Sequence, residues 1–362
     1  MTFKLQSGRK TVVPIALLAG TGLVLAACGG NGGNGENGGS SSGGGEVIVA
    51  GFGGAYGDAQ VEAYYDVYNE ESDTKLSVLN TEASLGAVSV QVENDNVQWD
   101  IVELNGADMV AGCLAGVLEP IDYDVVNKDV LEENAGEECG LAASFYTVGI
   151  GYNNEDWPDE PPTWEDFYDP SSFPGKRAIE SYIQDGTLEY ALMGDGVNKN
   201  DLYPLDLDRA VDALNAVADD LIVVDSLDQA SQLLTSGDAT LIQTGSARML
   251  ALQEEGLDVG YIPVGQTGGS YWVVPKNAPN KEAAMEFLAW AGDCVECSTV
   301  LGELTAYAGP NAEGNTQVEG DVAEMLPSDP DVAELSFPVD LDWWGENTEE
   351  AQDAFNRFMT SQ

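Results

Sequence analysis

The segment with the clearest chemical potential is the glycine-rich run Gly51-Phe-Gly-Gly-Ala-Tyr-Gly57. It follows the apolar stretch 46–50, which predicts a buried strand, and it precedes a helical pattern. Free backbone N–H groups at such a helix start face any small ligand in a neighbouring cleft. The dinucleotide fingerprint would require its third glycine where Tyr56 stands. A small-ligand loop is therefore favoured over a nucleotide loop, with packing as the competing role for Tyr56.

Several kinds of catalysis are excluded by residue type. The chain contains no histidine, which excludes histidine triads, histidine zinc sites and histidine bases. Ser246, in Gly245-Ser246-Ala247, does not form a hydrolase elbow and has no usual base. Paired carboxylates for glycoside hydrolysis remain open, because a chain this acidic always supplies them. An enzyme is the minority interpretation, and we expect no cofactor and no metal.

The charge balance sets the surface chemistry. The 362 residues include 63 acids and 13 bases, a net charge of −50. This excludes nucleic acid as a partner, because phosphates need a basic surface. Acids spread along the chain indicate a solvated coat suited to concentrated salt, where the Debye length falls to roughly 3 Å. We therefore interpret the chain as a halophilic acidic protein. A nucleic-acid mimic is disfavoured, since the chain carries an export signal.

The first 45 residues predict export and membrane anchoring. Lys4, Arg9 and Lys10 precede an apolar stretch at 12–24, which is typical of a signal peptide. Leu25-Ala-Ala-Cys28 resembles the lipobox of exported lipoproteins, which implies cleavage after residue 27 and two lipid chains on Cys28. Residues 28–45 then form a Gly/Asn/Ser linker with a reach of roughly 5–6 Å × √17, about 23 Å. The general and twin-arginine export routes both remain open.

Four further cysteines follow the linker. Cys113, Cys139, Cys294 and Cys297 form an even set, which favours disulfides in an exported protein. Pairing of Cys113 with Cys139 would close a mid-sized loop, and pairing of Cys294 with Cys297 a very tight one. Redox or zinc chemistry at the second pair is less favoured, because the neighbours are acidic and no histidine is available.

The elements that position these residues alternate between strand and helix. Strands are expected at 46–50, 75–79, 99–104, 145–152, 221–224, 239–244, 259–263 and 271–274. Helical patterns stand between them, including one capped by Ser84 and one with a Thr163–Asp166 capping box. This alternation predicts an α/β fold with mainly parallel sheets covered on both faces. Ligands of such sheets bind beyond the carboxyl ends of the strands.

Several longer runs resemble the spermidine/putrescine-type substrate-binding proteins of ABC importers over nearly the whole folded region. The runs are Gly53-Gly-Ala-Tyr56, Trp99-Asp-Ile-Val-Glu103, Leu118-Glu-Pro-Ile-Asp122, Pro162-Thr-Trp-Glu-Asp-Phe167, Phe173-Pro-Gly-Lys-Arg-Ala178, the run from Tyr203 to Ala210, and the run from Tyr271 to Ala284. The resemblance implies a two-lobed periplasmic-binding-protein type II fold, in which a ligand is clamped by hinge closure. It implies that the first lobe comprises 46–146 plus 268–312 and the second 147–267 plus 313–362, with crossings near Tyr146 and Gly268.

The resemblance also implies the binding residues. They are Tyr56, Gly54, Asn105, Glu103, Ser226, Gln243, Thr244, Ser270, Tyr271, Tyr307 and Trp344. The family's acid before the second crossing is Ser270 here, which weakens the prediction of a polyamine. Glu103, Glu180, Asp185 or Asp225 could replace that acid. For Tyr271 and Trp344, pocket wall and core remain alternative roles.

We therefore interpret the chain as a monomeric, lipid-anchored receptor on the extracellular face of the cell membrane. Its partners would be a small polar or cationic, polyamine-like solute and the transmembrane subunits of an ABC permease. An extracellular hydrolase using paired carboxylates and a surface adhesion protein are the alternative interpretations.

Overall fold

The computed structural model describes residues 46–361 apart from residues 82 and 158–160. The predicted signal peptide, Cys28 and the linker lie outside the described residues. Within the described part of the chain, no helix is both long and apolar enough to cross a membrane.

The first lobe is built on a sheet of five long strands with a parallel core. Its strands are β1 (Glu46–Gly51), β2 (Lys75–Asn80), β3 (Ile101–Asn105), β9 (Gln266–Val273) and the first half of β4 (Leu141–Asn153). The pairs β1–β2 and β1–β3 are parallel, whereas β9 is antiparallel to both β3 and β4. Short β10 (Phe337–Pro338) pairs with β9.

Both faces of this sheet are covered by helices, because alternate side chains point to opposite sides. On one face, Ile101 and Trp272 pack against the helices that hold Tyr64 and Phe287. On the other face, Val102 and Tyr271 belong to a second cluster. The helices and turns of the first lobe are α1 (Gly54–Gln60), π-helical η1 (Val61–Tyr65), α2 (Asp66–Glu71), α3 (Leu85–Glu93), α4 (Gly106–Leu114), α10 (Lys281–Asp293), α11 (Val295–Thr305) and α12 (Ala312–Asn315).

The second lobe is also a sheet with helices on both faces. Its parallel strands β5 (Arg177–Glu180), β6 (Leu221–Val224) and β7 (Leu241–Gly245) join the second half of β4, with β8 (Val259–Ile262) antiparallel to β4. Two apolar clusters again lie on opposite faces, since Ile179 and Leu241 face one and Ala178 and Ile242 the other. The helices around this sheet are α5 (Trp164–Phe167), α6 (Thr187–Gly194), α7 (Leu207–Ala216), α8 (Leu227–Ser236) and α9 (Ser246–Glu254).

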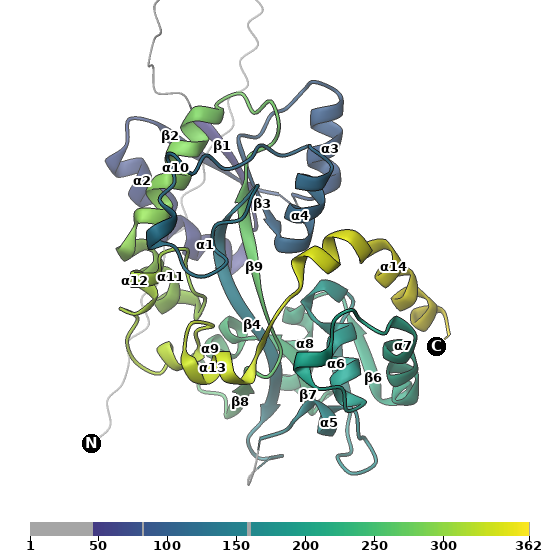
Figure 1. The fold of residues 1–362 in the computed structure, drawn as a ribbon. Helices are drawn as coiled ribbons and strands as arrows, with labels where there is room; N and C mark the ends of the chain where they lie inside the picture. Colours follow the sequence, from purple (N-terminus) through teal and green to yellow (C-terminus); the bar gives the residue numbers. More distant parts are fainter. Residues whose placement is uncertain (1–45, 82, 158–160, 362) are drawn as a thin grey trace, which may run out of the picture. The chain divides into compact units, whose positions relative to one another are not determined.

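Two long strands join the lobes. Figure 1 shows β4 and β9 running from one lobe toward the other. They pair antiparallel from Leu141↔Trp272 to Thr147↔Thr267, and Tyr146 lies opposite Gly268. The predicted α/β fold of the periplasmic-binding-protein type is confirmed. The two crossing strands are antiparallel to their neighbours β3 and β7, and β8 is antiparallel to β4.

The C-terminal part of the chain follows α13 (Pro330–Leu335) and ends in the long helix α14 (Leu341–Thr360). Trp344, Phe355 and Phe358 of α14 lie in the core of the second lobe. At its N-terminus, Leu341 instead packs against the first lobe, beside Gly106. The helix therefore contacts both lobes, and the lobe boundaries stay a prediction.

The glycine-rich segment differs from the tight loop expected at 51–57. Helix α1 already begins at Gly54, whose φ of 72° is open to glycine and strained for other residues. Tyr64, Tyr65 and Tyr68 are buried as the helical pattern predicts. The helix passes through the π-helical turn η1 on the way. The predicted Ser84 cap and the Thr163–Asp166 capping box are both confirmed.

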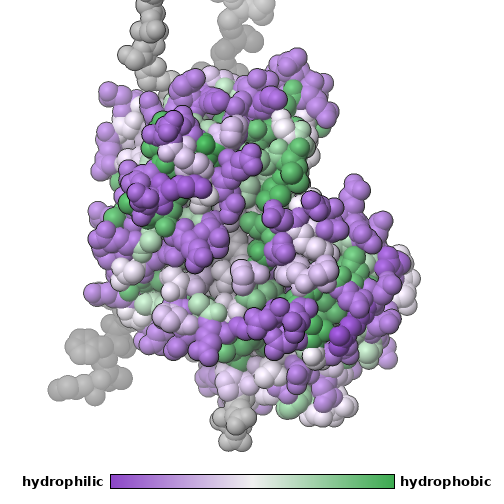
Figure 2. Space-filling model, viewed as in Figure 1, coloured by the Kyte–Doolittle hydropathy of each residue, from purple (hydrophilic) through white to green (hydrophobic). Residues whose placement is uncertain are grey.

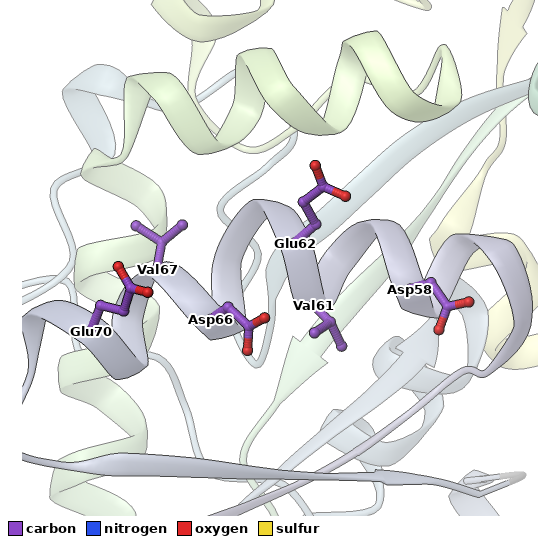
Figure 3. Close-up of a pocket in the computed structure, with 6 residues that line it drawn as sticks. All are labelled: Asp58, Val61, Glu62, Asp66, Val67 and Glu70. Carbon is purple, nitrogen blue, oxygen red and sulfur yellow. The ribbon is translucent and has the colours of Figure 1, made fainter.

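The surface carries the acid excess. Figure 2 shows hydrophilic residues over most of the visible face. Along α1, η1 and α2 the carboxylates of Asp58, Glu62, Asp66 and Glu70 are exposed and stand four residues apart beside a shallow open hollow (Figure 3). Like charges at this spacing destabilise a helix by about 0.2–0.5 kcal/mol per pair. Salt screens this repulsion.

We predict that Glu62→Lys raises the melting temperature in dilute buffer and has little effect in about 2 M KCl. The change turns two repulsive pairs, with Asp58 and Asp66, into attractive ones worth roughly 1 kcal/mol together. Thermal unfolding at both salt concentrations measures the effect, and Glu62→Gln should give about half of it. An equal gain at both concentrations would exclude electrostatic repulsion as the cause.

A buried carboxylate lies in the core of the second lobe. The side chain of Glu189 is fully buried and accepts hydrogen bonds from Tyr203 Oη at 2.7 Å and Trp344 Nε1 at 2.9 Å. Burial raises the pKa of Glu189 from 4.5 to about 7, although both donors oppose the shift. Because the folded-state pKa lies above the unfolded one, the stabilising contribution is complete below pH 4.5 and is lost as the pH rises through 7.

We predict that Glu189→Gln makes the free energy of unfolding less dependent on pH between 5 and 8, by up to about 3 kcal/mol. The amide oxygen can still accept both hydrogen bonds, and any constant packing cost leaves the difference between the two pH values unchanged. Denaturant unfolding in about 2 M KCl measures it, with Glu62→Gln as an exposed control. A pH dependence equal to that of the wild type would show that the pKa of Glu189 is not raised in the folded protein.

Candidate functional site: a cavity at the crossing strands

A small cavity lies where the two lobes meet at the crossing strands. Its walls come from the end of β3 and start of α4 (105–107), from Tyr146 of β4, from the turn 182–185, from β9 (266–269), and from the C-terminal segment including Trp344. This position is the carboxyl-end edge of β3, where ligands of such sheets bind. Asn105 and Trp344, both predicted binding residues, therefore line it.

One hydrogen-bond network forms the first-lobe side beside the cavity. The Tyr56 hydroxyl lies 2.7 Å from Glu103 Oε1, 2.8 Å from Ser144 Oγ and 3.0 Å from Ser270 Oγ. Burial raises the pKa of the Glu103 carboxyl, while hydrogen bonds from Ser270, Tyr56 and Gln60 lower it. Three of the predicted binding residues, Tyr56, Glu103 and Ser270, are thus brought together. The Tyr56 and Ser270 hydroxyls and Glu103 Oε1 are occupied by one another, whereas Glu103 Oε2 is buried with no hydrogen-bond partner among the described residues.

Three tyrosine rings form a row from this network toward the second lobe. The Tyr307 ring lies 5.5 Å from the rings of both Tyr56 and Tyr146. Tyr307 is held by its backbone N–H, which donates to Thr305 Oγ1 at 3.1 Å, and by pairing of Ala308 with Phe145. The rings are tilted by 48° and 37° to one another, and of the three Tyr146 lines the cavity. Aromatic faces of this kind can contact methylene groups or a cation.

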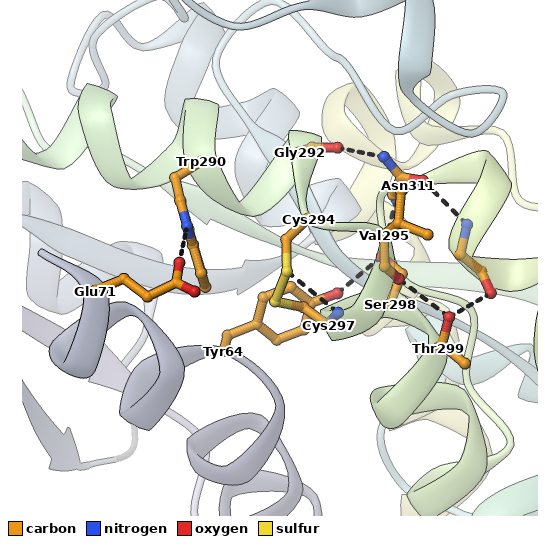
Figure 4. Close-up of a disulfide and its surroundings, with 11 residues drawn as sticks. Tyr64, Glu71, Trp290, Gly292, Cys294, Val295, Cys297, Ser298, Thr299 and Asn311 are labelled. Carbon is orange, nitrogen blue, oxygen red and sulfur yellow. Dashed lines mark hydrogen bonds between the residues drawn. A yellow bond between two sulfur atoms is a disulfide. The ribbon is translucent and has the colours of Figure 1, made fainter.

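The loop that carries Tyr307 is anchored at the start of α11. Figure 4 shows the Cys294–Cys297 disulfide there, next to Ser298 and Asn311. Ser298 Oγ accepts from the Asn311 backbone N–H at 3.1 Å, and Asn311 Nδ2 donates to the Gly292 carbonyl at 2.9 Å. The second disulfide joins Cys113 to Cys139. Among the described residues, the cluster suited to a metal is Cys113, Cys139 and Glu138, and its two sulfurs are bonded to each other.

The second-lobe side carries opposite charges. Asp185 lines the cavity and accepts a hydrogen bond from the Tyr146 hydroxyl at 3.0 Å. Glu180 is a buried neighbour of Asp185, and burial raises the pKa of both carboxyls. Arg248 interacts with the Tyr307 hydroxyl and pairs with Asp228 at 2.7 Å. A carboxylate pair and a guanidinium therefore both adjoin the tyrosine row.

Other predicted residues have structural partners. Gln243 is buried; its Oε1 accepts from the Glu180 backbone N–H and Thr187, and its Nε2 donates to the Asp185 carbonyl. Tyr271 faces the core and donates to the Asn134 carbonyl at 3.3 Å. Ser226 caps α8 by accepting from the Gln229 backbone N–H. None of these three lines the cavity, so each is better explained by folding than by direct contact with a ligand there.

The remaining predicted residues differ in exposure. Gly54 is exposed at the start of α1, and Thr244 is fully buried with no partner for its hydroxyl among the described residues. The Asn105 side chain caps α4 and also donates to the Tyr182 hydroxyl of the turn 182–185. This hydrogen bond closes one side of the cavity.

Sequence reasoning did not find Tyr146, Tyr182, Gln266 or Arg248 as binding residues. Tyr146 was predicted only as a crossing point, because the direction of its side chain depends on the strand pairing. A usable signal existed for Arg248. It is a scarce base in the first turn of α9, where a cation opposes the helix dipole. A base at a helix position where a positive charge is unfavourable indicates that this base has a local function.

Comparison with known proteins identifies the family. Residues 63–312 match the bacterial extracellular solute-binding protein model, and the chain belongs to this family. It is 29% identical over 316 residues to a γ-aminobutyric acid-binding protein of Pseudomonas aeruginosa, covering 85% of this chain and 89% of that protein. Such proteins bind solutes for ABC transporters without chemical change, so this chain is an extracellular solute-binding protein and not an enzyme.

Solved structures agree. The binding protein AgtB of Agrobacterium tumefaciens R10, in complex with agropinic acid, has 30% identity and a TM-score of 0.76, over 87% of this chain and 98% of that chain. A γ-aminobutyrate receptor has 28% identity and a TM-score of 0.80, over 87% and 97%. A putative spermidine/putrescine transporter protein from Listeria monocytogenes has 18% identity and a TM-score of 0.69, over 88% and 99%, which shows a shared fold alone. The resemblance thus holds at the level of solute-binding proteins.

Gln243 and Thr244 allow a sharp test of structural against binding roles. We predict that Gln243→Leu lowers the free energy of unfolding by about 2 kcal/mol, because it leaves the Glu180 N–H without an acceptor and removes the donor to the Asp185 carbonyl. The neighbouring Thr244→Val should change it by less than about 0.5 kcal/mol, since the lost hydroxyl had no partner. Denaturant unfolding without ligand measures both. Equal costs would contradict the structural role of Gln243.

Proposed function

We propose that this chain is the receptor of an ABC importer for a small zwitterion with a carboxylate and an ammonium group, such as γ-aminobutyrate. The cavity at the crossing strands and the adjoining tyrosine row are the proposed binding site. Two relatives are named for γ-aminobutyrate, which supports this solute class. The observation that carries the proposal is that opposite charges, the Asp185 carboxyl and the Arg248 guanidinium, both adjoin the tyrosine row.

Arg248 is the proposed partner of the solute carboxylate. Its guanidinium is planar and presents paired donors that match a carboxylate. In the described part of the chain it is the basic residue that contacts this row of tyrosines. The fully buried Arg177, by contrast, donates to backbone carbonyls including those of Phe167 and Gly175, which is a folding role.

Asp185 is the proposed partner of the ammonium group, supported by Glu180. The rings of Tyr146 and Tyr307 would contact the methylene groups between the charged ends. A polyamine fits this arrangement less well, because its second ammonium group would lie near the Arg248 guanidinium. Repulsion between like charges in a partly buried site lowers affinity. We therefore do not extend the proposal to polyamines.

The anchoring of the receptor is part of the proposal. Cleavage before Cys28, two lipid chains and the linker 28–45 would keep a monomeric receptor near its permease at the extracellular face of the membrane. Closure of the two predicted lobes over the solute would present the liganded form to the permease.

We predict that γ-aminobutyrate raises the melting temperature, corresponding to about 2.7 kcal/mol at a hundredfold excess over Kd. Butyrate and n-butylamine lack one charged group each, so both should bind at least tenfold more weakly, and putrescine should follow n-butylamine. The measurement is a thermal-shift series followed by calorimetric titration in molar KCl. Tighter binding of putrescine than of γ-aminobutyrate would contradict the zwitterion proposal, and no binding by a broad panel of solutes would contradict the receptor role.

Arg248→Gln tests the carboxylate end. It should weaken γ-aminobutyrate binding by roughly 10- to 150-fold, the equivalent of a charged hydrogen bond worth 1.5–3 kcal/mol, and should leave n-butylamine binding nearly unchanged. Arg209→Gln is the matched control, because Arg209 pairs with Asp195 on the surface. A parallel loss for both solutes would place the effect on folding instead.

A further inference from the structure

The carboxyl group of Glu180 stands out among the buried polar groups beside the cavity. The residue is 7% exposed, and its Oε2 has no hydrogen-bond donor among the described residues. Its closest electrostatic neighbour is the Asp185 carboxyl, with which it interacts directly. Asp185 in turn lines the cavity. A buried acceptor without a donor is costly, so this oxygen requires a proton or a cation that is part of the functional state.

The groups around this pair do not supply two positive charges. Tyr146 of β4 donates to Asp185 Oδ1, and Tyr182 is a neutral hydroxyl from the same turn as Asp185. Arg248 of α9 attracts both carboxylates, but its Nε is bonded to Asp228. Glu189 of α6 adds a further nearby acid. Two adjacent buried carboxyls in such surroundings retain one proton between them, and burial raises the pKa of each.

We infer that Glu180 and Asp185 form an ammonium subsite that exchanges a proton for the ligand: the empty receptor holds one proton between the two carboxyls, and the arriving ammonium group displaces it. This inference rests on the proposed function and adds a thermodynamic linkage to it. The balance is simple. One O–H bond of the carboxyl pair breaks, the proton passes to solvent, and the ligand N–H groups donate to the two carboxylates in its place.

The linkage fixes the direction of the pH dependence. Below the pKa of the pair, each pH unit should raise the apparent affinity about tenfold, because binding competes with one proton. The increase should stop where the pair has lost its proton or where the ligand ammonium group itself deprotonates, near pH 10 for an alkylamine. In acid, where the proton is held tightly, the receptor should release its solute.

Calorimetric titration of γ-aminobutyrate in two buffers of different ionisation enthalpy counts the protons released. At pH 7 we expect about one proton for the wild type. We expect none for Glu180→Gln, whose amide imitates the protonated acid and cannot lose a proton, together with an affinity nearly independent of pH. Glu189→Gln is the matched control: it removes another buried acid nearby and should keep the release.

A second measurement needs no ligand. At pH 8, the infrared spectrum of the ligand-free receptor should contain the carbonyl band of a protonated carboxyl group, which Glu180→Gln removes and Glu189→Gln retains. Circular dichroism and melting temperature establish that each variant is folded. Absence of this band in the wild type would overturn the inference whether or not any solute binds.

Different results would overturn the proton exchange and the receptor role. Binding of γ-aminobutyrate without proton release, or equal release by wild type and Glu180→Gln, overturns the proton exchange and leaves the receptor role intact. Failure of every solute in the panel overturns the proposed function, and the infrared measurement then still decides whether the pair holds a proton.

Discussion

The antiparallel pairing of β4 with β9 is the constraint on which the rest of the structure depends. β4 pairs with β7 and β8 of the second lobe, and β9 joins it to β3 of the first lobe, so their register fixes where the two halves meet. Tyr146 lies opposite Gly268, and at Gly269 a side chain would begin only 3.0 Å from the Phe145 ring. Small residues on β9 thus leave the space that the tyrosine row and the cavity use. The binding residues are then placed by strand ends and short turns that this pairing holds in position.

The pairing also explains how the acid of the site is supplied. The family acid expected before the second crossing is replaced by Ser270, which lies 2.6 Å from Glu103 Oε1. A carboxylate at position 270 would face Glu103 in a buried environment, where two like charges are strongly unfavourable. The carboxylates proposed for the ligand are therefore those of Asp185 and Glu180, at and after the end of β5, in place of one on β9. A serine at this position is a consequence of Glu103, and it does not remove acid chemistry from the site.

Much of the fold could be predicted from the sequence, because burial of strands and capping of helices leave local patterns. The strand at Leu221–Val224, the helix at Ser246–Glu254 and the capping box at Thr163 follow their patterns closely. Tyr56, Glu103 and Ser270 could be grouped from a family resemblance. Glu180 and Asp185 could be named only among four candidate acids, and Arg248 was not found. Their meeting depends on register and on the direction of turns far apart in the chain. Gln243 shows the opposite error, because the sequence suggests a ligand contact where the structure shows a folding role. A polar residue at the end of a strand resembles a ligand contact in sequence, while its partners are the Glu180 N–H of another strand, the Thr187 hydroxyl and the Asp185 carbonyl.

In concentrated salt, the many exposed acids cannot help the proposed site to select its solute. In molar salt the Debye length is roughly 3 Å, so the surface charge neither attracts a cation nor repels a carboxylate over any useful distance. Selection of a solute must then come from contacts made within the closed cavity, where water and salt ions are excluded and pairing is strong. A zwitterion has no net charge to be steered, and it gains from both ends at once. In the proposed site, the buried Glu180–Asp185 pair and Arg248 would make such short-range contacts.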